Sequence, residues 1–353
     1  MFYELIQVAL GQREKLSRSP SEEEWAELFV LSQKQGVVGV VLPALEKLSS
    51  KGQKPSTLLL LEWIGLGEQI KERNRLVNQR CIEVCRLFSE AGLRSCILKG
   101  QGNALMYPNP LLRSSGDIDI WIDGTREDIK EFVVSRCAGA QDGNMHIQFP
   151  IFEDVPVEVH YKPRYSSVPK YDKRLQAWFR EKADEQFWHK VRLEDSEICV
   201  PTTAFNVVQQ MSHIMGHFFV EGIGLRQFVD YYYVLQKLQE EKCSEDYGTL
   251  FDYLGLLRFA RGVMWVEHEM LGLSEKFMIC EPDERIGRII LKEIEEGGNF
   301  GHYDQRYSFR KNGLLARGIT DSYRLVKLAY YFPEDALWKI VRKVENQKWK
   351  IWS

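Results

Sequence analysis

The stretch Arg113-Ser-Ser-Gly-Asp-Ile-Asp-Ile-Trp-Ile-Asp123 decides the fold, because it alternates carboxylates with β-branched apolar residues. In a strand, successive side chains point to opposite faces, so Asp117 and Asp119 share one face and the isoleucines share the other. We expect the isoleucine face to be buried. Two carboxylates about 7 Å apart repel each other by roughly 2 kcal/mol at an effective dielectric of about 20. A hard divalent cation such as Mg²⁺ would remove this cost, so the stretch predicts a strand that carries a metal site.

Two further segments extend this pattern on either side. Upstream, Cys96-Ile-Leu-Lys-Gly-Gln-Gly-Asn103 is typical of a strand that enters a glycine turn and then a helix, which aims free backbone N–H groups at an anion. Downstream, Val157-Glu-Val-His alternates again and places Glu158 and His160 on one face. We therefore expect Glu158 to join the two aspartates as a third carboxylate on the sheet.

The composition is that of a globular protein. The chain has 353 residues, of which 44% are hydrophobic and 27% charged, and its net charge of −3 gives no general attraction to nucleic acid or anionic membranes. Seven cysteines without CxxC spacing indicate reduced thiols and a cytoplasmic protein. The N-terminus lacks a basic segment followed by an apolar one, and Glu62 interrupts the longest apolar stretch. We expect neither secretion nor membrane insertion.

Hydrophobic spacing divides the chain into three regions. Residues 1–92 form an N-terminal helical region, 93–165 a core with strands, and 166–353 a C-terminal helical domain. Ser19 and Pro20 are expected to begin a helix that Gly36 ends. The four expected strands are 95–98, 118–122, 146–151 and 155–161. The other expected helices are 40–48, 57–92, 126–137, 175–190, 203–218, 225–239, 247–270, 284–296 and 321–348.

The order strand, glycine turn, helix, paired aspartates and later strand carboxylate resembles the minimal nucleotidyltransferase core of the DNA polymerase β superfamily. The motifs are also similar to those of the bacterial uncharacterised nucleotidyltransferase family. These motifs are Lys34-Gln-Gly-Val-Val, Leu98-Lys-Gly100, Tyr107-Pro, Arg113-Ser-Ser-Gly-Asp-Ile-Asp119, Val157-Glu-Val-His160 and Gly224-Leu-Arg-Gln-Phe-Val-Asp230. The resemblance implies an α+β fold, with a small mixed sheet and packed helices between N- and C-terminal helical regions.

The resemblance also implies a reaction, the transfer of a nucleoside monophosphate from an NTP such as ATP to a hydroxyl. Asp117, Asp119 and Glu158 would bind two Mg²⁺ ions, or Mn²⁺, and Glu158 has general base as an alternative role. The acceptor is left open between a small molecule, a protein side chain and an RNA end. The residues expected to contact the nucleotide are Lys99, Gly100, Gln101, Arg113 and Ser114.

Two other functions stay open at this point. The superfamily turn is usually Gly-Gly or Gly-Ser, and Gln101 departs from it, which suggests a degenerate nucleotide-binding module that serves a partner protein. Aspartates in a DxD arrangement also occur in glycosyltransferases that bind Mn²⁺ and a nucleotide sugar. Those enzymes place several β–α units before the motif, whereas the first 90 residues here have helical patterns.

Other polar residues have simpler interpretations. His160 is expected to form a hydrogen bond within the sheet. His213 and His217 lie four residues apart on a predicted helix without a nearby acidic ligand, which favours packing over a zinc site. Arg226 and Asp230 have the same spacing and are expected to form an ion pair on a helix surface.

Overall fold

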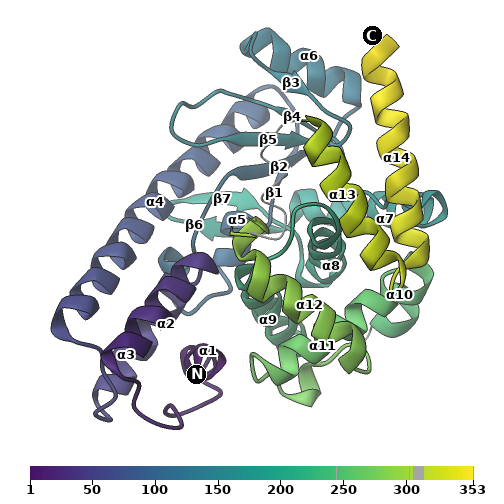
Figure 1. The fold of residues 1–353 in the computed structure, drawn as a ribbon. Coiled ribbons are helices and arrows are strands. Elements are labelled where there is room, and N and C mark those ends of the chain that lie inside the picture. The colour runs from purple at the N-terminus through teal and green to yellow at the C-terminus, as the bar shows by residue number, and fades with distance from the viewer. Residues whose placement is uncertain (244, 302, 305–313, 353) are drawn as a thin grey trace.

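The computed structural model describes residues 1–353 apart from 244, 302, 305–313 and 353 (Figure 1). The protein is α+β, with a five-stranded mixed sheet surrounded by helices that precede and follow it in the chain. The strand order is β1-β2-β5-β4-β3. The strands are β1 (Ser95–Leu98), β2 (Ile118–Ile122), β3 (Gln141–Asp142), β4 (His146–Gln148) and β5 (Val157–His160).

The middle of the sheet confirms the main expectation from the sequence. β2 pairs with β1 in the antiparallel and with β5 in the parallel direction, and Asp119 lies opposite Leu98 on one side and Glu158 on the other. The isoleucines of β2 are at most 2% exposed. They pack in a hydrophobic cluster with side chains of α4 (Thr57–Glu90) and α6 (Arg126–Arg136). Asp117 precedes β2 by one residue, because the strand begins at Ile118.

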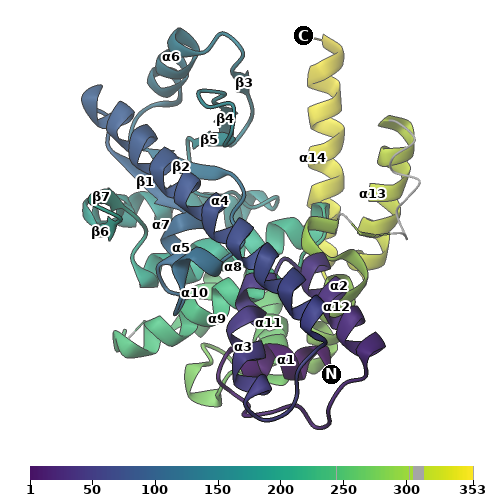
Figure 2. The same ribbon diagram turned by 90° about the vertical axis from the view of Figure 1, so that its left-hand side faces the viewer.

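Helix α4, which precedes the sheet in the chain, packs against it. Figure 2 shows the long helix α4 crossing one side of the molecule beside β1 and β2. The expected N-cap at Ser19 is wrong, because the capping box is formed by Ser21 and Glu24. Gly36, with φ +69°, follows the end of that helix as expected. The other helices of this region are α1 (Phe2–Ala9), α2 (Glu22–Lys34) and α3 (Val38–Ser49).

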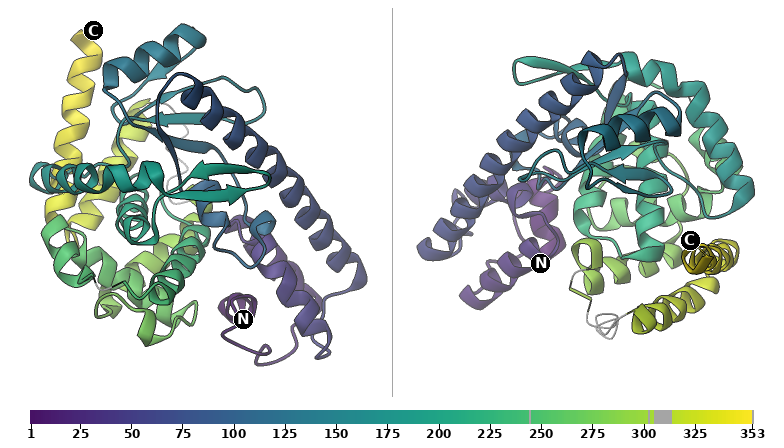
Figure 3. Two further views of the ribbon diagram at one scale, coloured as in Figure 1. Left: turned by 180° about the vertical axis from the view of Figure 1, so that it is seen from behind. Right: turned by 90° about the horizontal axis from the view of Figure 1, so that it is seen from above.

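The segment that follows the sheet in the chain differs from the expected structure at three places. A hairpin of β6 (Lys190–Leu193) and β7 (Ser196–Cys199) follows α7 (Pro169–Trp188), and it lies beside α4 and β1 (Figure 3). The expected helix 247–270 is divided into α10 (Tyr247–Leu254) and α11 (Leu257–Glu269), because Gly255 ends α10 with φ +74°. The expected helix 321–348 is two helices, of which the second begins at Pro333.

The rest of the C-terminal half is helical, as expected. Its helices are α8 (Thr203–Val220), α9 (Leu225–Glu240), α12 (Glu284–Gly297), α13 (Leu314–Ala329) and α14 (Pro333–Trp352). Short segments complete the fold, namely α5 (Gly100–Ala104) and the 3₁₀ helices η1 (Pro110–Leu112), η2 (Glu275–Phe277) and η3 (Asn299–Gly301).

Buried hydrophobic side chains form two clusters in the described part of the chain. One combines α1, α2 and α3 with α8, α9, α11 and α12, so the N-terminal and C-terminal helices share a core. The other lies under the sheet against α4 and α6. The domain boundaries at 92/93 and 165/166 stay predictions. Among the described residues, no helix is long and apolar enough to span a membrane.

Candidate active site

Three carboxylates meet at the ends of neighbouring strands. Asp119 in β2 and Glu158 in β5 are register partners, and Asp117 directly precedes β2. One carboxylate oxygen of each residue lies within 4.8 Å of those of the other two. The structure thus brings together the carboxylates to which the sequence pointed, while their roles in binding and catalysis stay predictions.

The three groups differ in their electrostatic environment. The negative charge of Asp119 raises the pKa of Asp117, and partial burial raises it further. Burial also raises the pKa of Asp119, but the charge of Lys99 and a hydrogen bond with His160 outweigh this effect and hold the pKa below its usual range. Asp119 is therefore ionised at neutral pH, although its side chain is only 7% exposed.

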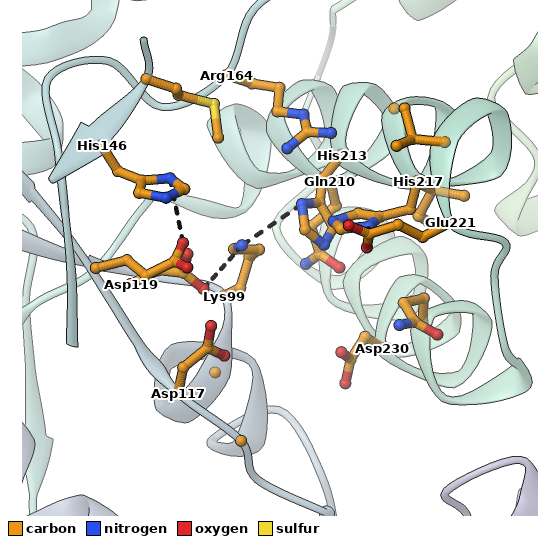
Figure 4. Close-up of a pocket in the computed structure, with 18 of the residues that line it drawn as sticks. Lys99, Asp117, Asp119, His146, Arg164, Gln210, His213, His217, Glu221 and Asp230 are labelled. Carbon is orange, nitrogen blue, oxygen red and sulfur yellow. Dashed lines mark hydrogen bonds and ion pairs between the residues drawn. The ribbon is translucent and has the colours of Figure 1, made fainter. Parts of the chain in front are cut away.

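Lys99 and His160 contact the two oxygens of Asp119. The ammonium of Lys99 lies 2.8 Å from Oδ2, and Nε2 of His160 lies 2.7 Å from Oδ1. Lys99 follows β1 in a turn with positive φ, 52°, which swings the chain from the strand into α5. Its close approach to Asp119 keeps a positive charge at the centre of the site (Figure 4).

Glu158 has a different set of neighbours. The side-chain amide of Gln148 donates a hydrogen bond of 2.7 Å to Oε1, and Nδ1 of His146 lies 3.3 Å from Oε2. Burial raises the pKa of Glu158, but a hydrogen bond with His160 and the charges of His146 and His160 together lower it below its usual value, so the group is held as a carboxylate. Strands β4 and β5 therefore position Glu158, and His160 links it to Asp119.

Two groups of side chains could hold a divalent cation, and Glu158 belongs to both. The first, with Asp117 and Asp119, offers only carboxylate oxygens, which suit Mg²⁺. The second, with His146 and His160, adds imidazoles, which suit Mn²⁺ or Zn²⁺ better than Mg²⁺. The repulsion that raises the pKa of Asp117 is what a bound cation would relieve, so the donor set fits the expected Mg²⁺. Such a cation would compete with Lys99 for Asp119.

Helix α8 supplies the facing wall. Gln210, His213 and His217 point from it toward the carboxylates (Figure 4). Nδ1 of His213 lies 3.4 Å from the ammonium of Lys99, and burial lowers the pKa of His213 well below its usual value. His213 is therefore neutral at physiological pH. The two histidines pack ring against ring, as expected, but they also line the site.

Helix α9 connects to the segment before β2. Arg113 and Asp230 form two hydrogen bonds of 2.7 Å, both residues are buried, and the hydroxyl of Tyr107 donates a third bond to the same carboxylate. Arg226 donates to the backbone carbonyl of Ser114 at 2.9 Å. The expected pair of Arg226 and Asp230 does not lie on a helix surface, because Asp230 is buried and α9 packs against α8 and α5.

Sheet and helices enclose a cavity of about 930 Å³. The sheet side contributes the three carboxylates with Lys99, Gly100 and Arg113, and the opposite side contributes polar groups of α8 and α9. This volume is near the upper end of the range for ligand pockets, roughly 300–1,000 Å³.

Comparison with known families now bears on this site. The family model of the uncharacterised nucleotidyltransferases matches residues 21–272, which include both walls of the cavity. The chain belongs to this family.

Other comparisons add little to this assignment. The structure of an antigenic nucleotidyltransferase-like protein from Paracoccidioides brasiliensis is similar over 60% of this chain and 96% of that one, with 9% identity and a TM-score of 0.35. A TM-score this low does not establish a shared fold. A search of curated proteins gave no match.

Two residues expected to contact the nucleotide do not line the cavity of this family member. Gln101 is 3% exposed, and its amide donates to the side chains of Asn74 and Asn78 on α4. Its place in the first turn of α5 directs the side chain toward α4. Ser114 lines a separate, smaller hollow, to which Arg73 also contributes. The sequence-based role of Gln101 and Ser114 thus finds no support in the geometry, whereas Lys99, Gly100 and Arg113 do line the cavity.

Several cavity residues were missed at the level of sequence. Arg164, His146 and Gln210 all line the cavity. One signal could have revealed Gln210, because polar residues recur on one face of the otherwise apolar α8 at Asn206, Gln210, His213 and His217. Arg164 follows a strand in an irregular segment and carries no such periodic signal.

Proposed function

We propose that the protein is a Mg²⁺-dependent nucleotidyltransferase, which moves a nucleoside monophosphate from an NTP to a hydroxyl of an acceptor. The observation that carries this proposal is the convergence of Asp117, Asp119 and Glu158 on one polar cavity beside a glycine turn. Membership of a nucleotidyltransferase family supports the same reaction class.

In this reaction the acceptor oxygen attacks the α-phosphorus in line, and the bond from that phosphorus to the bridging oxygen of the β-phosphate breaks. Pyrophosphate leaves with the bonding electrons. Mg²⁺ or Mn²⁺ held by the carboxylates would neutralise phosphate charge and lower the pKa of the acceptor hydroxyl. The hydroxyl proton passes to a general base, and Glu158 is the candidate if it is not itself a metal ligand.

The turn between β1 and α5 is the proposed place of the triphosphate. A Cβ added to Gly100 would meet only the backbone oxygen of Asp117, at 3.9 Å, so phosphate oxygens can approach the backbone closely. The ammonium of Lys99 lies at the same turn and would neutralise charge on the phosphates. Arg113, held by Asp230, would position the segment before β2 and add positive charge to this end of the cavity.

The experiment is label transfer from α-³²P-labelled ATP, GTP, CTP and UTP in the presence of Mg²⁺. A cell extract, divided into small molecules, RNA and protein, serves as the source of acceptor. Exchange of both aspartates in Asp117→Asn/Asp119→Asn should reduce transfer by ~10³-fold or more, since each metal contact contributes several kcal/mol to the transition state.

Asp123→Asn is the matched control, because Asp123 lies at the other end of β2 and pairs with Arg94 outside the cavity. Transfer that is equal in the double variant and the wild type would contradict the proposal. ATP binding without release of pyrophosphate from any extract fraction would instead favour the degenerate nucleotide-binding module.

A further inference from the structure

Arg164 occupies an unusual place in the cavity wall. It follows β5 by four residues, and its side chain reaches across to α8, where the guanidinium lies against Gly216. A Cβ added to Gly216 would lie 2.8 Å from Cζ and 3.0 Å from Nε of Arg164. The absence of a side chain at this position of α8 therefore creates the space in which the guanidinium rests.

This guanidinium lacks a carboxylate partner. Among the described residues, no carboxylate forms an ion pair with Arg164, and its Nε is enclosed without a hydrogen-bond partner. Glu221, a carboxylate directly after α8 on this wall, lies 3.0 Å from His217 instead. Burial lowers the pKa of Arg164, yet an arginine stays charged at physiological pH.

Two other cations of the cavity differ from Arg164 in this respect. Arg113 is paired with Asp230, and Lys99 is paired with Asp119. Arg164 is only partly buried, but a partly buried positive charge that no carboxylate of the described residues pairs with is favourably satisfied by a bound anion. Arg164 faces the open volume of the cavity (Figure 4), so the missing anion can come from a ligand.

The position of Arg164 indicates which ligand this is. The glycine turn follows β1, on one side of Asp119, whereas Arg164 follows β5, on the other side. In-line transfer places the attacking acceptor opposite the leaving pyrophosphate. With the triphosphate at the glycine turn, the acceptor lies on the side of β5 and Arg164.

A second cation, Lys339, packs against α8, with its Nζ 5.7 Å from the centroid of the Phe219 ring. Burial and the positive charge of Arg164 lower the pKa of Lys339 in α14 to about 8, while the charge of Asp335 opposes this shift. Two positive charges, those of Arg164 and Lys339, therefore lie against α8.

We propose that the acceptor carries an oxyanion, a phosphate monoester or a carboxylate, which binds the guanidinium of Arg164 while the hydroxyl of the acceptor faces the α-phosphate. The statement that this ligand is the acceptor rests on the proposed function. The oxyanion site itself is a property of Arg164 and Gly216. Two oxygens on one centre match the parallel N–H groups of a guanidinium.

The test measures binding of inorganic phosphate and of acetate by calorimetry, with Mg²⁺ and a saturating non-hydrolysable ATP analogue that fills the triphosphate site. Arg164→Met should weaken binding of the preferred anion by about 10- to 100-fold, the usual value of charge-assisted hydrogen bonds. Gly216→Ala, which keeps the arginine but fills its resting place, should weaken binding as well. The control Arg180→Met changes an exposed arginine of α7 and should have no effect.

Preference for phosphate would identify a phosphorylated acceptor, and preference for acetate a carboxylate. Equal anion binding by the wild type and both cavity variants would overturn the inference. So would a loss of ATP-analogue affinity of tenfold or more in Arg164→Met, because the arginine would then bind the nucleotide. The wild type's affinity for the analogue is measured separately, so failure of the nucleotidyltransferase proposal is distinguishable from failure of the oxyanion site.

Discussion

The two walls of the cavity are built in different ways. The sheet wall presents its carboxylates from the ends of strands. Neighbouring strands are about 4.8 Å apart, and their side chains alternate between the two faces of the sheet. The helical wall presents His213, His217 and Arg226 from helices whose other residues are mostly buried in a hydrophobic core. The sheet wall therefore follows from the local sequence pattern, whereas the helical wall depends on how α8 and α9 dock.

The walls also differ in how their charges are balanced. On the sheet wall, carboxylates face one another and their repulsion raises the pKa of Asp117. On the helical wall, Arg113 and Tyr107 compensate the charge of Asp230 and donate hydrogen bonds to both of its oxygens. We infer that side chains of the sheet wall perform the reaction and that much of the helical wall positions the sheet wall.

The largest expected effect concerns the sheet wall. Glu158→Gln removes a charge that serves either as metal ligand or as general base, so label transfer should fall by about 10²- to 10⁴-fold. The control is Glu197→Gln, an exposed strand carboxylate of β7 outside the cavity. A transfer rate in Glu158→Gln equal to that of the control would move the chemistry away from the sheet wall.

Next in size is the loss of a structural charge on the helical wall. Asp230→Asn leaves the guanidinium of Arg113 buried without a compensating charge, which should lower the free energy of unfolding by about 3–5 kcal/mol. Denaturant unfolding measures this. The double variant Arg113→Met/Asp230→Leu should recover most of the loss, and a single variant as stable as the wild type would contradict the positioning role.

A smaller effect is expected for Gln101, which the sequence assigned to the nucleotide and the structure turns toward α4. Gln101→Ala removes its hydrogen bonds with Asn74 and Asn78 and should cost about 1–3 kcal/mol of stability. The Kd for ATP should change by roughly twofold or less, or ~0.4 kcal/mol. A Kd weakened tenfold in a folded variant would restore the sequence-based role.

The smallest effect concerns a buried carboxyl group that does not line the cavity. Glu267 in α11 is 0% exposed, neither of its oxygens has a hydrogen-bond partner in the part of the chain that the structure describes, and burial raises its pKa well above the usual value. Below about pH 4.3 the group is protonated in both states. At higher pH only the unfolded state loses the proton, so Glu267 lowers the free energy of unfolding progressively until the pH passes the folded pKa.

Glu267→Gln removes this pH dependence. The stability of the variant relative to the wild type should therefore rise by ~1 kcal/mol or more between pH 5 and pH 8. Thermal unfolding at the two pH values measures it, with Glu269→Gln, an exposed position of the same helix, as control. If the relative stability of Glu267→Gln is the same at both pH values, neighbouring groups compensate the charge of Glu267 in the folded protein. The contrast in charge balance between the two walls would then be weaker.

The strands at the centre of the sheet could be predicted because their signal is local. Alternation in β2 and β5 fixed which residues face the core, and the buried isoleucines of β2 confirm it. The short β3 has no apolar signal, since both of its residues are exposed. The β6–β7 hairpin has alternating Val191, Leu193 and Ile198, but it was overlooked because its turn lacks glycine and takes a positive φ at Glu194 instead.

The helical wall could not be predicted in the same way. Arg226 and Asp230 have the spacing of a surface pair, and only the docking of α9 against the segment before β2 shows that each has a partner there. Arg164 depends on Gly216, which lies 52 positions later in the chain. Such contacts between distant segments are set by packing of the whole domain and leave no periodic trace in one sequence.

The central claim is that Asp117, Asp119 and Glu158 bind divalent cations together, and electron paramagnetic resonance of added Mn²⁺ tests it most directly. The wild type should bind Mn²⁺ and release it when Mg²⁺ is added, and Asp117→Asn/Asp119→Asn should abolish this binding while Asp123→Asn keeps it. Mn²⁺ binding that is unchanged in the double variant would contradict the claim.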